Sequence, residues 1–300
     1  MKIDIFSFYR SHYPRLWRDS IVKHQVLAYN SSPVKVYHSS NKRKMFNQIM
    51  DHYVEDANYI ISLIKMVGMT KRKKYLEIGG GLGLVYGYLK YLGFNIYSLE
   101  PSISGYGGFW PAAKNLLTIA SIDTTNWLPY KADEAENLGV HFDVIFSNNV
   151  LEHISNLRAS LLNLSRVLNV NGIMIHNTVN YWVPYEPHYK IPLVPLFPKL
   201  TELINPDLKR SPVWSDLNFI NPLKLYFIAW QCGLDLKIIP GQLLKTIKRL
   251  SFDKEFARRH HKINKYLLLL KLMTKLPAIL QTPLVFTLSH SSAINRSNKT

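Results

Sequence analysis

A glycine-rich turn between a predicted strand and a predicted helix is the strongest chemical signal in the sequence. The segment Tyr75-Leu-Glu-Ile-Gly-Gly-Gly-Leu-Gly-Leu84 is an apolar strand that runs directly into this turn. Glycines allow the backbone to approach a bound ligand without Cβ clashes. A dinucleotide site requires Gly-x-Gly-x-x-Gly, and Leu84 stands where its third glycine would be. Glu77 precedes the glycines, and a carboxylate there favours a cationic, amine-bearing ligand over a pyrophosphate.

A second acidic residue follows the next predicted strand, 95–99. Glu100 lies 23 positions after Glu77. In doubly wound folds, an acidic side chain at the end of the second strand accepts hydrogen bonds from ribose hydroxyls. The combined spacing therefore predicts a ligand that contains adenosine. The alternative is a simple glycine turn with an unrelated surface glutamate.

A third segment, residues 141–154, predicts a strand with a polar exit and a following helix. It reads His141-Phe-Asp-Val-Ile-Phe-Ser-Asn-Asn-Val-Leu-Glu-His-Ile154. Together, the three segments resemble the motifs of class I S-adenosylmethionine-dependent methyltransferases. They are most similar to the small-molecule enzymes whose fourth strand ends in a Val-Leu-Glu-His segment. The resemblance covers about residues 75–180, with Asn171-Gly172 at the turn before the fifth strand.

The resemblance implies that S-adenosylmethionine is held by Glu77, Gly79, Gly81, Gly83, Glu100, Asp123 and Asn148. The glycines would line its methionine part, with Glu77 near the amine. Glu100 would hold the ribose. Asp123 is the nearest match to the adenine-binding acid that follows the third strand, although its spacing departs from the family pattern. Asn148, at the exit of the fourth strand, would contact the methionine moiety.

Methyl transfer to an oxygen also needs a base, because the acceptor must lose a proton while it is held in line with the methyl group. Glu186 and His188 are the preferred candidates, since they lie in a rigid aromatic and proline-rich segment, residues 181–192. His176 is a further candidate, but its position inside a predicted strand also suits a core residue. His153 is interpreted as a structural partner of its turn. No metal site is expected.

Short apolar runs alternate with helical stretches from residue 74 onward, which is typical of βαβ units. We therefore expect a doubly wound, Rossmann-like, mainly parallel seven-stranded sheet with helical N-terminal and C-terminal additions. Strands are predicted at 75–78, 95–99, 117–122, 142–147, 172–178, 234–239 and 284–288. Helices are predicted at 84–92, 156–168 and 222–232.

The domain prediction divides the chain into three parts. Residues 1–73 form a basic helical extension, 74–290 the methyltransferase domain, and 291–300 a flexible tail. The domain carries insertions at 180–220 and 241–282. Seven prolines between residues 181 and 214 exclude a regular helix from the first insertion.

The net charge of +17 is concentrated in the flanks. Residues 1–74 contain 14 Lys/Arg against 5 Asp/Glu, residues 241–300 contain 12 against 2, and residues 75–240 contain 11 against 13. Basic flanks suit an anionic partner, such as phospholipid headgroups or a phosphate-bearing substrate, but a generally basic proteome explains them equally well. A basic helical region at 254–276 is one candidate for membrane contact, with packing on the core as the alternative.

The sequence thus predicts an enzyme, a methyltransferase acting on a small-molecule, sugar or lipid-linked acceptor. One alternative is a non-catalytic protein that binds RNA or an anionic membrane through its flanks. Another is an NAD(P)-dependent oxidoreductase, which Leu84 and Glu77 disfavour. Nucleic acid is not the expected partner. Without a signal-peptide pattern or an uninterrupted apolar span, the expected location is the cytoplasm, including peripheral contact with the inner face of the membrane.

Overall fold

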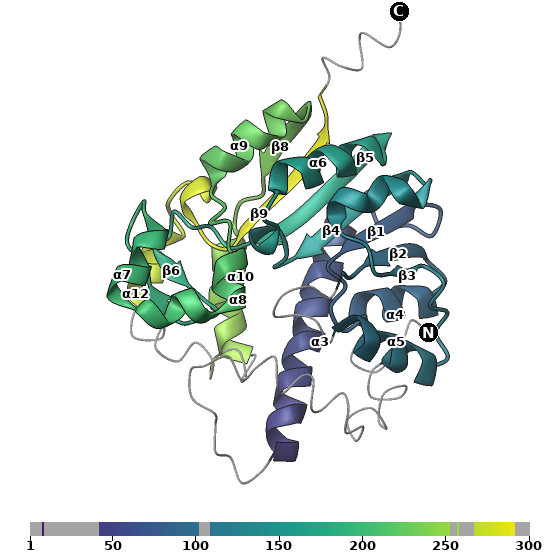
Figure 1. The fold of residues 1–300 in the computed structure, drawn as a ribbon, viewed down its shortest axis with the longest axis horizontal. Coiled ribbons are helices and arrows are strands. Elements are labelled where there is room, and N and C mark those ends of the chain that lie inside the picture. Colours follow the sequence, from purple (N-terminus) through teal and green to yellow (C-terminus); the bar gives the residue numbers. More distant parts are fainter. Residues whose placement is uncertain (1–7, 9–41, 102–108, 253–256, 258–266, 292–300) are drawn as a thin grey trace, which may run out of the picture.

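A seven-stranded sheet forms the centre of the computed structural model, which describes residues 8, 42–101, 109–252, 257 and 267–291 (Figure 1). Its strands are β1 (Lys74–Ile78), β2 (Asn95–Leu99), β3 (Trp127–Leu128), β4 (Phe142–Asn148), β5 (Leu168–Thr178), β8 (Leu234–Ile238) and β9 (Leu284–His290). Their order is β3-β2-β1-β4-β5-β9-β8, and β9 runs antiparallel to both of its neighbours. The predicted mainly parallel, doubly wound sheet is confirmed.

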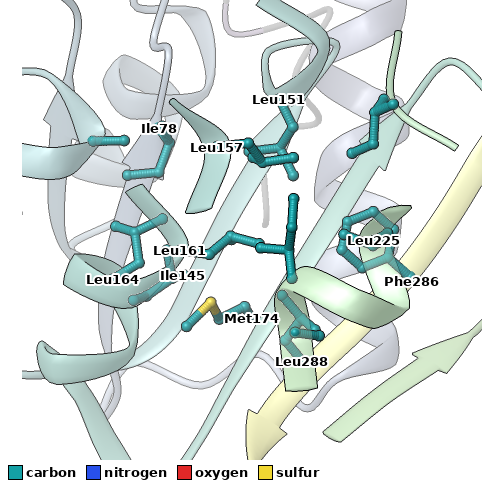
Figure 2. Packing of buried hydrophobic residues seen from close by; sticks show 14 of the residues in the cluster. Ile78, Ile145, Leu151, Leu157, Leu161, Leu164, Met174, Leu225, Phe286 and Leu288 are labelled. Carbon is teal, nitrogen blue, oxygen red and sulfur yellow. The ribbon is translucent and has the colours of Figure 1, made fainter. Parts of the chain in front are cut away.

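Helices cover both faces of the sheet because the strands are apolar on both sides. Along β1, Tyr75 joins one core and Leu76 the other. The first core packs under α3 (Lys42–Met66), α4 (Leu84–Tyr91) and α5 (Phe109–Ile119). The second packs under α6 (Leu157–Arg166) and α9 (Pro222–Gln231), with the 3₁₀ helix η3 (Ala132–Leu138) beside α6. Figure 2 shows Leu161 and Leu164 of α6 directed at Ile145 and Met174 of the sheet.

The predicted third strand at residues 117–122 is wrong. Residues up to Ile119 belong to α5, and the third strand is β3, which pairs with β2 at Ser98 and Leu99. The buried residues Ala113, Leu116 and Leu117 recur at helical spacing, so this apolar run is one face of a helix. A short apolar run alone does not separate a buried helix from a strand.

The first insertion contains only short elements, as its prolines predicted. They are the hairpin β6 (Tyr185–Glu186) and β7 (Ile191–Pro192), followed by η5 (Pro198–Leu200), α7 (Thr201–Ile204), η6 (Pro206–Arg210) and α8 (Pro212–Asp216). The insertion is anchored to the second core through Leu208, Trp214 and Leu217, which are buried. The insertion therefore packs against the second core.

The second insertion contains α10 (Gln242–Phe252), α12 (Leu267–Met273) and the short helix η8 (Ala278–Leu280). Helix α10 is tied to α3, because Arg249 forms an ion pair with Asp56 at 2.9 Å. Three predicted segments lie largely outside the described residues. They are the first half of the predicted basic helix 254–276, most of the N-terminal extension, and all but the first residue of the predicted flexible tail. Across the described ranges, no helix is both long enough and apolar enough to cross a bilayer.

Candidate active site

The carboxyl ends of β1, β2 and β4 meet at the point where the strand order reverses. Successive strands run outward from β1 to β2 and β3 on one side, while β4 and β5 lie on the other. In open parallel sheets, ligands bind in the crevice outside the strand ends at such a switch point. The chain leaves β1 through the glycine turn, β2 at Glu100 and β4 at Asn149. Most of the cofactor residues predicted from the sequence are therefore brought together at one edge.

The glycine turn has the backbone conformation that its composition requires. Gly79, Gly81 and Gly83 have φ values of 71°, 56° and 71°, in the left-handed region. The Gly79 amide donates a hydrogen bond to the carbonyl of Leu99 at 2.8 Å. The Gly81 amide donates one to Oε2 of Glu100 at 2.7 Å. These bonds lock the turn after β1 to the end of β2.

The glycines differ in the space that surrounds them. A Cβ on Gly79 would lie 2.4 Å from Cγ2 of Val150, and one on Gly80 would lie 2.2 Å from Oγ of Ser98. A Cβ on Gly81 would have nothing within 4 Å. Gly81 thus faces open space while its amide is held by a carboxylate. This is a cradle in which a ligand can lie directly on the backbone.

Glu77 is buried at the base of this turn. Its Oε2 accepts a hydrogen bond from Oγ of Ser98 at 2.9 Å. Burial raises the pKa of Glu77 to about 8, with the Ser98 hydrogen bond opposing the shift and the negative charge of Glu100 adding to it. The carboxyl is therefore largely protonated at neutral pH. A cation placed near it would favour the charged form.

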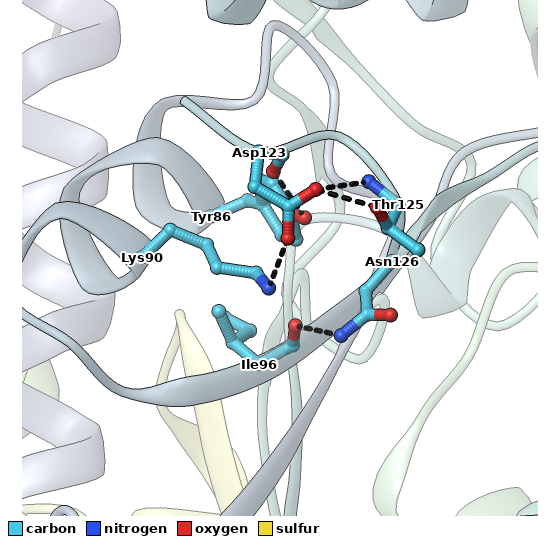
Figure 3. A network of polar contacts seen from close by, with 6 residues as sticks. All are labelled: Tyr86, Lys90, Ile96, Asp123, Thr125 and Asn126. Atoms are coloured by element: carbon cyan, nitrogen blue, oxygen red, sulfur yellow. Dashed lines mark hydrogen bonds and ion pairs between the residues drawn. The ribbon is translucent and has the colours of Figure 1, made fainter. Parts of the chain in front are cut away.

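Asp123 lies at the opposite end of β3 from this edge. It belongs to the loop that precedes β3, so it is at the amino end of that strand. Figure 3 shows its carboxylate bound to Lys90 at 3.0 Å and to the backbone amide of Thr125 at 2.9 Å. Hydrogen bonds from Thr125, and then from Lys90, lower the pKa of Asp123 to about 2.

The expectation for Asp123 rested on a third strand that ends before it, and that strand is wrong. The structure gives Asp123 a loop-closing role, and its contact with adenine stays a prediction. Asp133, in η3, is the first acidic residue after β3. The two-residue strand Trp127–Leu128 carries too little pattern to be recognised from the sequence.

Glu186 and His188, each predicted as a candidate acid or base, are in contact. Nδ1 of His188 lies 2.7 Å from Oε1 of Glu186. Glu186 is fully buried and also accepts hydrogen bonds from the Tyr181 hydroxyl at 3.2 Å and the Tyr189 amide at 2.8 Å. The His188 side chain is 28% exposed. A fixed, buried carboxylate therefore orients a partly exposed imidazole, which is the arrangement of a general base and its positioning residue.

The segment after β4 connects this pair to the glycine turn. Val150 lies against Gly79, and three residues later the ring of His153 contacts that of His188, with centroids 4.9 Å apart. Burial, followed by the charge of His188, lowers the pKa of His153 to about 3. His153 is therefore neutral at physiological pH, which agrees with a structural role.

Glu152 is a buried member of this cluster to which the sequence reasoning assigned no role. It accepts a hydrogen bond from Oγ1 of Thr178 at 2.7 Å, and burial raises its pKa. It lies in the η4 turn (Leu151–His153) and is fully buried. Its position four residues after the end of β4, preceded by Val150 and Leu151, is the sequence signal that would have marked it.

His176 on β5 and Asn148 on β4 lie on paired strands but in different environments. His176 is fully buried, its Nδ1 is 2.8 Å from Oγ of Ser147, and burial lowers its pKa to about 3. It has a place in the core and is not brought together with Glu186 and His188. Asn148 is held at the exit of β4, where Nδ2 of Asn177 donates to its Oδ1 at 2.7 Å.

The described ranges contain no group of three or more His, Cys, Asp or Glu side chains that could hold a metal ion. The groups that the structure brings to this edge are the glycine backbone, the buried Glu77 and Glu100, and the Glu186–His188 pair.

A family model described as "Methyltransferase domain" matches residues 50–219. An uncharacterized protein of Mycobacterium tuberculosis is 31% identical over 192 residues, which are 61% of this chain and 65% of that protein. The ubiquinone biosynthesis O-methyltransferase of Rickettsia typhi is 32% identical over 124 residues, 41% of this chain and 48% of that one. Among solved structures, a putative sarcosine dimethylglycine methyltransferase from Galdieria sulphuraria is 17% identical, with 80% of this chain and 85% of that chain covered and a TM-score of 0.46.

The matched family covers more than half of the chain and includes the glycine turn and strands β1 to β5 of the sheet. The chain belongs to this methyltransferase-domain family. It spans about 65% of the length of the mycobacterial relative.

Proposed function

We propose that this protein transfers a methyl group from S-adenosylmethionine to an oxygen of a small-molecule, sugar or lipid-linked acceptor. The contact between buried Glu186 and partly exposed His188, beside the glycine turn, is the observation that carries this proposal. A relative whose name places it in ubiquinone biosynthesis, from Rickettsia typhi, supports transfer to oxygen. A demethylmenaquinone methyltransferase of Tropheryma whipplei, 24% identical over 213 residues, supports a small-molecule acceptor.

The cofactor fits the residues at the switch point. Gly81 offers a backbone surface with nothing within 4 Å of its Cβ position, which suits the methionine part of S-adenosylmethionine. Glu100 would accept hydrogen bonds from the ribose hydroxyls through the carboxylate that already holds the Gly81 amide. Glu77 would lie near the cofactor amine, and Gly79, Gly83 and Asn148 would complete the lining. When bound, the cofactor supplies an activated methyl group.

His188 would act as the general base in this mechanism. The acceptor oxygen would pass its proton to the imidazole as it takes up the methyl group that the bound cofactor would supply. Glu186 holds the ring through Nδ1 and stabilises the imidazolium that forms. Tyr181 and the Tyr189 amide keep the Glu186 carboxylate in place. The protein's main task is to hold the acceptor in line with the methyl group.

A methyl-transfer assay with labelled S-adenosylmethionine and a panel of hydroxylated acceptors tests the proposal. His188→Ala is expected to lower kcat about 100-fold or more at neutral pH and to leave cofactor affinity unchanged. His141→Ala is the matched control, since this exposed histidine lies before the amino end of β4. A His188→Ala variant with normal kcat would remove the proposed base.

A lipid-linked acceptor would bring the protein from the cytoplasm to the inner face of a membrane. This location is also the one that the basic flanks favour, because the cytoplasmic leaflet carries anionic lipid.

A further inference from the structure

Residues 196–204, within the first insertion, expose an unusual density of large apolar side chains. Five of these nine residues are exposed Leu, Phe or Ile, and Leu196 and Ile204 are 80% and 77% exposed. The stretch contains η5 and α7, at the left of Figure 1. Single exposed apolar residues are normal, but contiguous patches mark sites of interaction. The patch consists of Leu196, Phe197, Leu200, Leu203 and Ile204.

The patch is held in place by buried contacts beneath it. Oγ1 of Thr201 accepts a hydrogen bond from the Val194 amide at 3.0 Å, and Trp214 donates one to Glu202 at 2.8 Å. Trp214 itself is buried in the second core. The apolar side chains therefore protrude from an anchored segment. Side chains that are open on nearly all sides suit insertion into a soft medium better than packing against a rigid protein face.

Basic side chains outnumber acidic ones in and around the patch, where Glu202 is held by Trp214 and Asp207 by Arg210. Lys199 lies inside the patch, Lys209 and Arg210 follow it, and Lys224 lies at the start of α9. The pKa of Lys224 is lowered, first by burial and then by the charge of Lys199, so the two ammonium groups are close enough to repel each other. In the part of the chain that the structure describes, no ion pair includes Lys199, Lys209 or Lys224, and Nζ of Lys224 donates a hydrogen bond to the Asn218 carbonyl at 2.7 Å. An anionic group at this surface would relieve that repulsion.

The combination of protruding apolar side chains and uncompensated lysines identifies the partner. A second copy of the chain would bring the same lysines toward each other, on two proteins with a net charge of +17 each. An anionic bilayer offers both a phosphate layer for the lysines and an apolar layer for the leucines beneath it. We propose that the patch 196–204 docks the protein on an anionic lipid bilayer, with Lys199 and Lys224 at the level of the lipid phosphates.

Flotation with lipid vesicles tests this docking on the full chain. The wild type should bind vesicles of phosphatidylcholine mixed with phosphatidylglycerol and should bind pure phosphatidylcholine vesicles much less. Leu203→Ser combined with Ile204→Ser should weaken binding about tenfold or more, because two inserted side chains are lost. Lys199→Gln should weaken binding to the mixed vesicles at low salt. At high salt, where the charge interaction is screened, it should bind like the wild type.

Exposed apolar residues at the amino edge of the sheet provide the matched control. Met66, at the end of α3, and Val170, near the start of β5, are 52% and 65% exposed. Met66→Ser combined with Val170→Ser removes the same number of exposed apolar side chains and should leave vesicle binding unchanged. Thermal unfolding verifies that both double variants fold.

Three results would overturn the proposal. The wild type could fail to bind mixed vesicles, or both double variants could lose binding equally. Alternatively, sedimentation velocity could show a dimer that disappears only in the Leu203/Ile204 variant, which would make the patch a contact between copies. Vesicle binding needs no cofactor, so its failure is distinguishable from a failure of methyl transfer.

Discussion

Substitution of Gly81 by alanine distinguishes the structural role of the glycine turn from its proposed role in cofactor binding. Gly81 has a φ of 56°, and a Cβ there would meet no protein atom within 4 Å. The Cβ would instead occupy the space proposed for the cofactor. Gly81→Ala should therefore retain the fold and lose affinity for S-adenosylhomocysteine.

The magnitudes follow from the geometry. An alanine in the left-handed region destabilises the fold by about 1–2 kcal/mol. A methyl group inside a filled site forces displacement of the ligand, and overpacking of this kind is unfavourable by about 1–3 kcal/mol. At about 1.4 kcal/mol per factor of ten, the affinity should fall between about fivefold and more than 100-fold.

Gly139 supplies the matched control, because it also has a positive φ, 58°, and open space at its Cβ position. It lies at the end of η3, where no cofactor residue is proposed. Gly139→Ala should show the same loss of stability in thermal unfolding and no loss of affinity in calorimetry. An unchanged affinity in Gly81→Ala, or an equal loss in both variants, would refute the reasoning.

The remaining predictions concern stability, pH and catalysis. Gly80→Ala should destabilise the fold by about 3 kcal/mol in chemical denaturation, because its Cβ would lie 2.2 Å from Oγ of Ser98, and native stability would contradict this packing. The pKa of Glu77 rises on folding from 4.5 to about 8, so the native state holds a proton that the unfolded state releases, and the free energy of unfolding should fall as pH rises from about 5 to 8. The pKa difference of about 3.5 sets an upper bound of roughly 5 kcal/mol on this loss. In Glu77→Gln, the free energy of unfolding measured by chemical denaturation should no longer fall with pH over this range. Glu186→Gln should lower kcat more than it changes KM in the methyl-transfer assay, because it disorients His188 without touching the cofactor; a change in KM alone would make Glu186 an acceptor-binding residue.

Much of the fold was predictable because its strands are flanked by strong local signals. The run that becomes β1 ends in glycines, and β2 ends directly before Glu100, so both strands and their edge follow from short-range pattern. The same pattern failed at residues 117–122. There, a buried face of α5 looks like a strand when read alone, and the true third strand has only two residues.

The candidate site was predictable where sequence neighbours become neighbours in space. Glu186 and His188 are two residues apart, and the β6 turn brings them to 2.7 Å. The pair of Glu152 and Thr178 was not predictable, because 26 positions separate them and only the parallel pairing of β4 and β5 joins their segments. The buried environment of His176 likewise depends on the antiparallel strand β9, which comes from the far end of the chain.

Calorimetric titration of S-adenosylhomocysteine into the wild type and Glu100→Gln, with NADH titrated in parallel, tests the central claim most directly. Gln keeps an acceptor for the Gly81 amide but removes the charge that would hold the ribose hydroxyls. The account predicts binding of S-adenosylhomocysteine to the wild type, about tenfold weaker binding or more in the variant, and no binding of NADH. Equal affinities in the two proteins, or binding of NADH alone, would contradict it.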